Sequence, residues 1–378
     1  MKFKDIIGLE KTKKHLIQTV TDNRISHTQL FLGQKGSGNL ALAIAYAQYI
    51  NCTNKQNNDS CGTCASCIKF EKLIHPDLHF IFPVAKLKGM KDASSQDDFF
   101  LSKWREISYD KNYHFTLNEW YEKMGIENKQ GSINTHDAKS VVKTLMYKSY
   151  ESEYKIMLIW MPELLHISAA PRLLKIIEEP PKKTLFLLVA ESTDKIIKTI
   201  LSRAQIVKIP NYNESDIEKY FSTKTSPQKA KEAAYLANGS IVEARRVINV
   251  SETEKYYFES FRKWMRSCFK ADFLAITDFV NEISKQVRER QKSFLHYSLK
   301  LIRYCIIKNY SGDELIRLAG EEKKFVSDFS PFINDKNVEQ LYEEINTAMY
   351  YIERNAKSEI VFTNLSIKIT KLIHAGKK

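Results

Sequence analysis

The 378-residue sequence has no hydrophobic run long enough to cross a membrane. Apolar segments such as 156–160 and 185–190 have the length of buried strands and fall far short of the roughly 20 residues that a bilayer helix needs. The first residues, Met1 to Asp5, lead into no apolar signal core. These absences argue against a membrane-spanning protein and predict a soluble, cytoplasmic one with no membrane partner.

A glycine-rich turn lacks two residues that phosphoryl transfer requires. Residues 30–42 read as a buried strand, a turn and the start of a helix, which is the Walker A layout. In a working loop, a Lys that reaches the phosphates and a Ser or Thr that holds Mg²⁺ follow the last glycine. Asn39 and Leu40 occupy those positions, although converging backbone N–H groups can still form a weak anion site. The glycines of the degenerate loop are Gly33, Gly36 and Gly38.

A second nucleotidase motif is also incomplete. In a P-loop ATPase, an apolar strand ends in Asp-Glu, which holds Mg²⁺ and polarises water. The matching strand here ends in Trp160 and Met161, and Glu163 comes one or two places late. We interpret Glu163 as an exposed charge at a strand end or helix start. Because both motifs lack their charged groups, we expect no functional ATP site and no intrinsic ATPase activity.

The composition is that of a globular protein with excess positive charge. Hydrophobic residues make up 43% and charged residues 27% of the sequence, and 58 Lys and Arg residues against 45 Asp and Glu residues give a formal net charge of +13. This excess favours contact with a polyanion. The alternative is an ordinary solvated surface. At this length, two or three domains are expected.

Four of the six cysteines lie close together, directly after the helix that follows the glycine-rich turn. Their C-x8-C-x2-C-x2-C pattern turns thiolates towards one point, and a fourth thiolate would close a tetrahedral site, so a structural Zn²⁺ is predicted. The alternatives are disulfides, which a reducing cytosol disfavours, and a redox pair, which would not need four cysteines. The cluster is Cys52, Cys61, Cys64 and Cys67, while the isolated Cys268 and Cys305 are expected in the core.

Strand and helix patterns alternate in the first half of the chain, and helices alone follow. A strand, a glycine-rich turn and a helix, continued by further strand–helix pairs, predict an α/β domain with a parallel sheet. After Pro210 the strand signals largely cease. The predicted divisions are an α/β domain over 1–210, with a zinc module at 52–67 and an insertion at about 84–131, a small helical domain over 211–250 and a long helical region over 251–378.

Individual elements are predicted from hydrophobic periods and helix breakers. The expected strands are 29–32, 154–160, 184–190 and 204–209. The expected helices before residue 250 are 10–22, 39–50, 136–149, 168–179, 214–220, 227–237 and 240–248, and later breaks are expected near Asp272, 311–312 and 330–331. The insertion mixes polar residues with Phe99, Phe100, Trp104, Tyr109, Tyr113, Phe115, Trp120 and Tyr121, and no function is assigned to it.

One arginine stands at the start of the last expected strand. In the segment 199–205, Arg203 lies just before the α/β domain ends. Such an arginine can reach across a subunit boundary and complete a neighbour's γ-phosphate site. The local sequence equally allows an ordinary surface or inter-element salt bridge.

The assembled motifs resemble those of the bacterial DNA polymerase III clamp loaders, a branch of the AAA+ clamp-loader family, and in particular their delta-prime subunits. The similarity runs over most of the chain, and its specific part is the combination of Glu-Glu-Pro-Pro, Ser-Arg and the cysteine cluster. The segments that carry it are 5–8, 25–27, 30–33, the four cysteines with 75–77, 131–133, 173–181, 199–203 and 353–356.

The resemblance implies a RecA-like AAA+ domain, a small helical lid and an all-α collar through which five subunits form a ring. Motor subunits of the family keep the loop Lys and the acidic pair, whereas delta-prime stator subunits lack them. The resemblance assigns Arg203 as an arginine finger for an adjacent motor subunit; Ala204 replaces the family's Cys, which affects only local packing. Arg245 or Arg246 falls in the sensor 2 helix and, with no ATP to sense, is structural or contacts DNA phosphate.

The implied role is a non-hydrolysing subunit of a ring that loads a sliding clamp onto primed DNA in replication. The implied partners are motor ATPase subunits, a clamp-opening subunit, the sliding clamp and primed DNA within the complex. Two other functions remain open. An AAA+ ATPase with unusual motifs would bind Mg-ATP with micromolar affinity and turn it over, and a free-standing zinc-containing DNA-binding protein would bind DNA as a salt-sensitive monomer.

Overall fold

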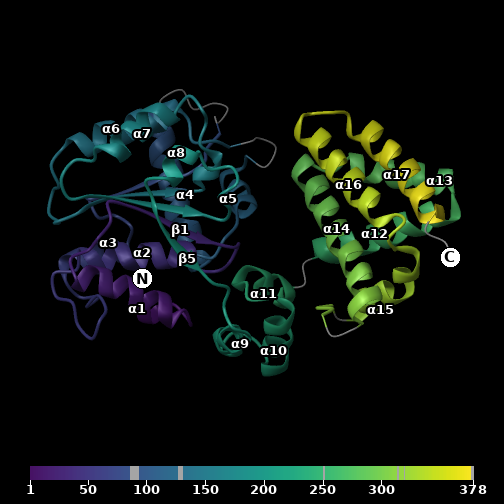
Figure 1. Ribbon diagram of the computed structural model, residues 1–378, viewed down its shortest axis with the longest axis horizontal. Coiled ribbons are helices and arrows are strands. Elements are labelled where there is room, and N and C mark those ends of the chain that lie inside the picture. Colours follow the sequence, from purple (N-terminus) through teal and green to yellow (C-terminus); the bar gives the residue numbers. More distant parts are fainter. Residues whose placement is uncertain (86–92, 127–130, 250–251, 313–314, 319, 376–378) are drawn as a thin grey trace. The chain divides into compact units, whose positions relative to one another are not determined.

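The computed structural model describes residues 1–85, 93–126, 131–249, 252–312, 315–318 and 320–375. The chain forms two compact units, Met1–Ile248 and Asn249–Lys378 (Figure 1). Among the described residues, the strands all lie in the first unit and the second unit is helical. The expected fold class, an α/β domain with a parallel sheet followed by helical segments, is confirmed.

The first unit is built on a five-stranded sheet in which each strand runs parallel to its neighbours, in the order β2-β3-β4-β1-β5. Every residue of β3 and β4 is buried, as expected for parallel strands with both faces covered. The middle strand is β4, and β1 pairs with β4 on one side and with the edge strand β5 on the other. The strands are β1 Thr28–Gly33, β2 Leu78–Ile81, β3 Lys155–Trp160, β4 Thr184–Ala190 and β5 Gln205–Ile209.

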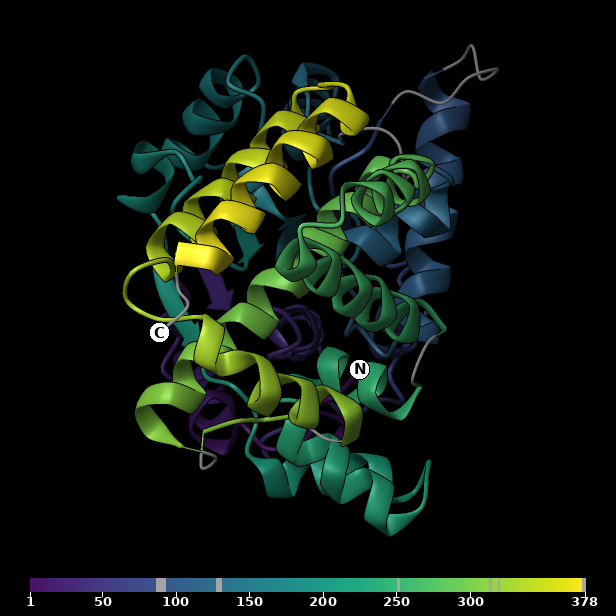
Figure 2. The same cartoon turned by 90° about the vertical axis from the view of Figure 1, so that its right-hand side faces the viewer.

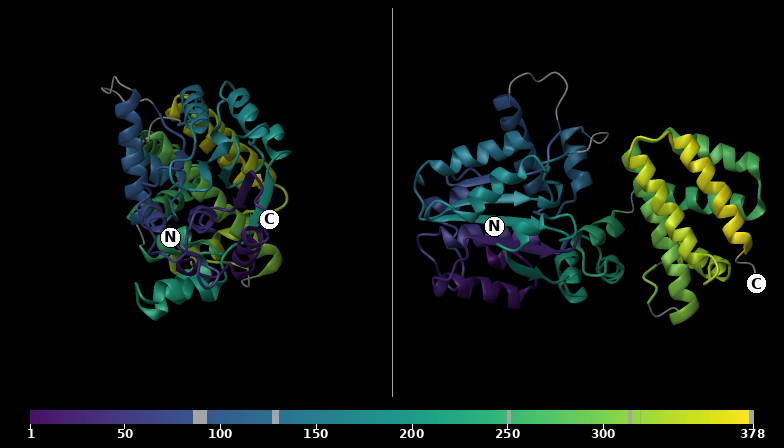
Figure 3. Two further views of the ribbon diagram at one scale, coloured as in Figure 1. Left: turned by 90° about the vertical axis from the view of Figure 1, so that its left-hand side faces the viewer. Right: turned by 45° about the horizontal axis from the view of Figure 1, so that its top comes forward.

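Helices cover both faces of this sheet, as the right-hand view of Figure 3 shows. Alternate residues of β3 face two different cores: Ile156 and Leu158 pack with α2 and the insertion, whereas Met157 and Ile159 pack with α6 and α7. The helices around the sheet are α1 Glu10–Thr21, α2 Asn39–Ile50, α3 Ala65–Glu71, α4 Ala93–Asp110, α5 Leu117–Met124, α6 Thr135–Met146, α7 Ala170–Glu178 and α8 Lys198–Leu201, with the 3₁₀ turns η1 Phe3–Asp5 and η2 Pro162–Leu164.

The insertion expected at about 84–131 is largely helical and carries a buried ring cluster. Residues 86–92 and 127–130 lie outside the described residues, and α4 and α5 occupy most of the rest. The Trp104 ring lies 4.6 Å from Phe82, 5.5 Å from Trp120 and 5.2 Å from Trp160, measured between centroids. Because Trp160 ends β3, this ring cluster fastens the insertion to the end of the central sheet.

Most predicted boundaries agree with the structure to within two residues, but α6 ends at Met146 and not at Ser149. The backbone turns extended at Tyr147, and the Lys155 ammonium donates to the carbonyls of Thr144, Leu145 and Tyr147. A cation that caps free carbonyls in this way ends the helix. Sequence periodicity also missed β2, α3 and α8, which are only 4, 7 and 4 residues long.

Three short helices follow β5 and pack around an alanine-rich core. Their packing is tight because Ala230, Ala233 and Ala234 let α10 approach its neighbours closely. These helices, called here the three-helix segment, are α9 Glu214–Ser222, α10 Pro227–Leu236 and α11 Ile241–Ile248.

The second unit is a bundle of helices (Figure 2), and it packs around buried aromatic rings. Trp264 stacks on Phe279 at 5.0 Å, and the indole N–H donates to Ser366. Cys268 and Cys305 are buried, as predicted, and burial raises the pKa of each thiol to about 12. The helices are α12 Glu252–Lys270, α13 Phe273–Ser284, α14 Arg288–Ser311, α15 Gly320–Phe329, α16 Val338–Glu353 and α17 Ser358–Ala375, with η3 Ser330–Phe332.

The expected breaks in this unit are confirmed. Asp272 caps the start of α13, and α14 ends at Ser311 before Gly312, whose φ of 66° is left-handed. Throughout the part of the chain that the structure describes, no helix is both long enough and apolar enough to cross a bilayer.

Replacing Trp104 by Ala should destabilise the first unit, because the side chain is 1% exposed and its removal leaves a cavity in the ring cluster. We expect a loss of about 3–5 kcal/mol in the free energy of unfolding, measured by urea denaturation followed by circular dichroism. Met146→Ala is the matched control, since Met146 is 74% exposed. Equal effects of the two substitutions would contradict a core role for the cluster.

Candidate functional site

The glycine-rich loop lies at the carboxyl end of β1, the strand between β4 and β5, and leads into α2. Gly36 and Gly38 have φ angles of 79° and 85°, which side chains other than glycine rarely adopt. Helix α2 then begins at Asn39. The backbone therefore retains the strand–turn–helix form of a phosphate-binding loop.

The side chain at the position of the loop Lys is turned back into the protein. Asn39 Nδ2 donates to the carbonyls of Gly33 at 3.2 Å and Ala190 at 3.0 Å. Its Oδ1 accepts from the backbone N–H of Leu40 at 2.9 Å. Leu40 is itself buried. Asn39 thus joins the loop to the end of β4 and contributes no positive charge.

Rings replace carboxylates at the end of β3. Trp160 is buried, and its ring lies 5.2 Å from both Trp104 and Phe115. Met161 is buried as well. Neither side chain offers an oxygen ligand, and hard cations such as Mg²⁺ require oxygen. The end of β3 therefore provides no side-chain ligand for a nucleotide-bound metal.

Glu163 was expected as an exposed charge, and this expectation is wrong. Its Oε1 accepts the backbone N–H groups of Glu191 at 2.6 Å and Ser192 at 3.0 Å, which ties η2 to the end of β4. Its Oε2 is buried. Burial raises the pKa of Glu163, and burial together with Glu163 raises the pKa of Glu191 to about 7. The side chain is structural because it organises the loop after β4.

The three-helix segment binds the glycine-rich loop directly. Ser240 Oγ donates to the carbonyl of Lys35 at 2.8 Å, and the N–H of Ile241 donates to the carbonyl of Gly36 at 3.2 Å. The hydroxyl of Tyr212 lies so close to Gly38 that a Cβ there would be 2.0 Å from it. The chain's own residues thus pack against both glycines of the turn.

The two arginines of α11 point to different partners. Arg245 Nη2 donates to the carbonyl of His114 at 2.8 Å and to Glu119 Oε1 at 3.0 Å, both in the insertion. Arg246 pairs with Glu243 of the same helix at 3.2 Å. Arg245 therefore has a structural contact, whereas Arg246 lies in an exposed pair.

Sequence reasoning missed the roles of His114 and Glu119. The signal for Glu119 was present, because Thr116-x-x-Glu119 is the pattern of a capping box. Thr116 Oγ1 accepts from the N–H of Glu119, and the carboxylate accepts from the N–H of Thr116. No local signal points to the contact between His114 and Tyr212, since the two residues lie far apart along the chain.

Arg203 lies on the surface, directly after α8. Its side chain is 38% exposed, and Nη2 pairs with Glu178 of α7 at 2.8 Å. Nη1 donates to the carbonyl of Thr199 at 3.0 Å. The geometry therefore contains the salt bridge that the sequence allowed, and it leaves part of the guanidinium accessible.

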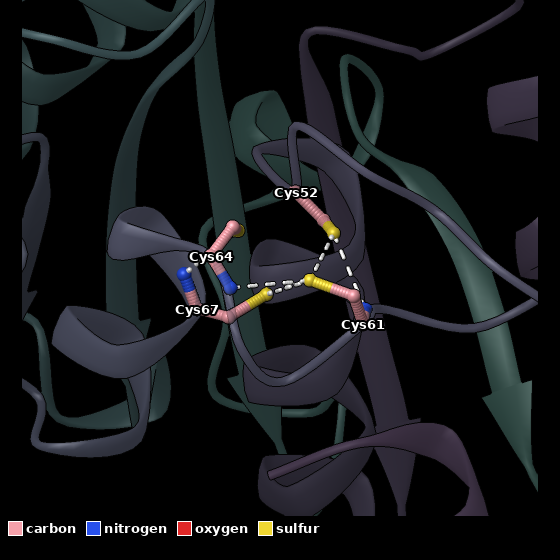
Figure 4. A group of neighbouring side chains, drawn as sticks. All are labelled: Cys52, Cys61, Cys64 and Cys67. Carbon is pink, nitrogen blue, oxygen red and sulfur yellow. Dashed lines mark hydrogen bonds between the residues drawn. The ribbon is translucent and has the colours of Figure 1, made fainter.

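The four clustered cysteines converge on one point (Figure 4). Their sulfur atoms all lie within 4.8 Å of one another, with Cys52 and Cys61 3.6 Å apart and Cys61 and Cys67 3.9 Å apart. Zn–S bonds of about 2.3 Å in a tetrahedron place sulfurs about 3.8 Å apart, so the donor set fits a metal such as zinc. The fourth ligand is Cys64, the N-cap of α3.

Backbone N–H groups point at the sulfurs, as they do around thiolates. Hydrogen bonds led by that from the N–H of Thr63 lower the pKa of Cys61 to about 6. The N–H of Cys61 donates to Cys52 Sγ at 3.3 Å, and that of Cys67 to Cys64 Sγ at 3.4 Å. Burial raises the pKa of Cys52 and Cys67, so a cation is needed to keep these two as thiolates.

A family model described as "DNA polymerase III, delta subunit" matches residues 8–213, more than half of the chain. The match covers the sheet, the glycine-rich loop, the cysteine cluster and Arg203. It ends at Asn213, immediately before the three-helix segment.

Curated relatives come from bacterial DNA polymerase III. The chain is 26% identical over 257 residues to subunit gamma of Buchnera aphidicola, covering 65% of this chain and 57% of the relative. It is 26% identical over 229 residues to subunit delta' of Bacillus subtilis, covering 60% of this chain and 56% of the relative. The chain thus spans little more than half the length of these relatives.

A solved structure, a gamma subunit-related protein of DNA polymerase III from Thermotoga maritima, covers 97% of this chain and all of its own, with 12% identity and a TM-score of 0.41. The Bacillus subtilis DNA clamp loader delta protein covers 95% of this chain with 11% identity and a TM-score of 0.31.

We predict that the purified chain contains one zinc ion and that Cys61→Ser abolishes stoichiometric binding, because three thiolates no longer close the site. Elemental analysis of the purified protein measures this directly. Cys305→Ala is the control, since Cys305 lies buried in the other unit. A metal-free wild-type chain, or full zinc content in Cys61→Ser, would contradict the prediction.

Proposed function

The chain belongs to the DNA polymerase III delta subunit family, and from this premise we propose that it is a non-hydrolysing, delta-prime-type stator subunit of a clamp loader. In this role it assembles into a pentameric ring with motor ATPase subunits and a clamp-opening subunit. The ring loads a sliding clamp onto primed DNA in replication. The observation that carries the proposal is the loss of charge at both nucleotide motifs beside an accessible Arg203.

The first support is chemical. Phosphoryl transfer needs cations and a metal to neutralise the charge that develops on the γ-phosphate. Here the Asn39 amide binds backbone carbonyls, and Trp160 and Met161 are buried at the end of β3. A chain with this site can keep the shape of an ATPase domain without its reaction.

The second support is the placement of Arg203. An exposed ion pair such as Arg203–Glu178 contributes only about 0–1 kcal/mol, so it exchanges readily for a better partner. A γ-phosphate with bound metal is such a partner, because guanidinium–phosphate hydrogen bonds are charge-assisted and bidentate. We therefore assign Arg203 as an arginine finger that acts on a neighbouring subunit's ATP.

The proposed mechanism uses this contact as a sensor. When ATP is bound to the neighbouring subunit, Arg203 binds its γ-phosphate and draws the adjacent AAA+ domains together. In this arrangement the ring holds an open clamp and fits primed DNA. Hydrolysis removes the charge that Arg203 binds. The contact is then lost and the clamp closes on DNA.

The proposal also gives a role to each domain, to the cysteine cluster and to the net charge. Residues 1–210 form the AAA+ domain, 211–250 the lid and 251–378 the collar that joins the ring. The cysteine cluster holds a structural zinc ion that fixes the segment between α2 and β2. The net charge of +13 assists contact with DNA inside the complex.

We expect no micromolar Mg-ATP binding and no ATP turnover by the isolated chain, measured by titration calorimetry and phosphate release. The double variant Asn39→Lys, Leu40→Thr should also fail to hydrolyse ATP, because the carboxylates at the end of β3 are still missing. A motor subunit of the same complex is the positive control. Tight binding with turnover by the wild-type chain would favour an ATPase and refute the stator proposal.

In a reconstituted complex, Arg203→Ala should lower the DNA-stimulated ATPase rate and clamp loading by about tenfold or more, because the finger stabilises transition-state charge. Assembly, followed by size-exclusion chromatography, should be unchanged. Lys183→Ala is the matched control, since it removes another exposed, ion-paired cation, here paired with Glu153 at 2.6 Å. Full activity of the Arg203 variant would show that Arg203 is not the finger.

A further inference from the structure

The insertion and the three-helix segment meet at a buried histidine. His114 is 4% exposed, and its Nε2 lies 3.0 Å from the hydroxyl of Tyr212, which packs against Gly38. Nδ1 lies 2.6 Å from the carbonyl of Asn112, which can only accept, so Nδ1 carries the proton and Nε2 accepts from Tyr212. Burial lowers the pKa of His114 to about 4, which keeps the ring neutral at physiological pH.

A partly buried ion pair lies beside this histidine. Arg245 of α11 binds Glu119 Oε1 at 3.0 Å and the carbonyl of His114 at 2.8 Å. The two side chains are 19% and 25% exposed. A charge that loses its partner in such a place also loses part of its hydration, so breaking this pair costs more than breaking a surface pair.

Contacts within the insertion hold the Glu119 carboxylate in the position where it binds Arg245. Its Oε2 accepts from the N–H of Thr116 at 2.8 Å in the capping box of α5, and Lys111 lies 3.5 Å from its Oε1. The carboxylate therefore has little freedom to lose when it binds the guanidinium. A second link, from Asn112 Nδ2 to the hydroxyl of Tyr220 at 3.5 Å, joins the same turn to α9.

The insertion is also fastened to the sheet. The Phe115 ring lies 5.3 Å from Trp104 and 5.2 Å from Trp160, so the residue after His114 belongs to the ring cluster at the end of β3. The turn 111–116 and α5 thus connect the rigid sheet to the three-helix segment. The segment also binds the carbonyls of Lys35 and Gly36 in the glycine-rich loop.

We propose that the insertion is a built-in clasp that fixes the three-helix segment against the glycine-rich loop without any bound ligand, and that Arg245 is the positioning residue through which it acts. This role goes beyond the stator proposal and does not depend on it, because all the contacts lie within one chain. It gives the aromatic-rich insertion a function and explains why the guanidinium of Arg245 lies at Glu119.

The clasp is tested by hydrogen–deuterium exchange on the full-length, nucleotide-free chain. Glu119→Gln keeps an acceptor for the capping box but removes the charge that holds Arg245. We expect amide exchange in α9, α10 and α11 to become at least about tenfold faster while β1 and β4 keep their protection, because the segment opens locally. Arg245→Gln should give the same pattern from the other side of the contact.

Two comparisons keep the proposal falsifiable. Glu106→Gln removes ion pairs with Lys103 and Lys123, both at 3.0 Å within the insertion, and should leave exchange in the three-helix segment unchanged. The double variant Glu119→Gln, Arg245→Gln should exchange more slowly than the product of the two single effects would give, since both substitutions break the same contact. Unchanged exchange in Glu119→Gln, an equal increase in Glu106→Gln or an equal loss of protection throughout the sheet would overturn it.

Discussion

The packing of the Trp160 ring, at the end of β3, against the insertion is the constraint on which much of the first unit depends. A carboxylate at the end of β3 would need water, a cation or hydrogen-bond donors around it. A tryptophan needs apolar neighbours, and Trp104 and Phe115 supply them. The apolar end of β3 and the attachment of the insertion are therefore two aspects of the same packing.

Neutral hydrogen bonds also dominate around the glycine-rich loop. Where a phosphate-binding loop would present a lysine, Asn39 forms neutral hydrogen bonds to two strands. Where a ligand would bring elements together, Ser240 and Ile241 bind loop carbonyls directly. The charge on Arg245 is matched by Glu119, and that of Lys35 in the loop is matched by Glu243 at 3.7 Å. These polar groups around the loop are thus bound by other residues of the same chain. This agrees with the proposed subunit, which responds to a neighbour's nucleotide and not to its own.

Arg203 and the cysteine cluster take no part in these contacts around the glycine-rich loop. Arg203 remains partly exposed, with only an exchangeable surface pair to Glu178. The cysteines form a compact donor set whose buried members need a cation to stay ionised. Arg203 is available to a partner, and the cysteines are available to a metal. These are therefore the groups that can still bind something from outside the chain.

The sequence by itself determined the fold class, four of the five strands and the convergence of the four cysteines, because these depend on short-range periods and spacings; the four-residue strand β2 is too short to be found in this way. It also predicts that Asn39, Leu40, Trp160 and Met161 stand where an ATPase has a lysine, a metal-binding hydroxyl and two carboxylates. Only the tertiary structure decided what the insertion does, why Arg245 differs from Arg246 and where Glu163 points. Those answers depend on contacts such as His114–Tyr212 and Glu119–Arg245, whose members lie about a hundred residues apart. Local sequence patterns carry no information on such pairs, since packing alone brings them together.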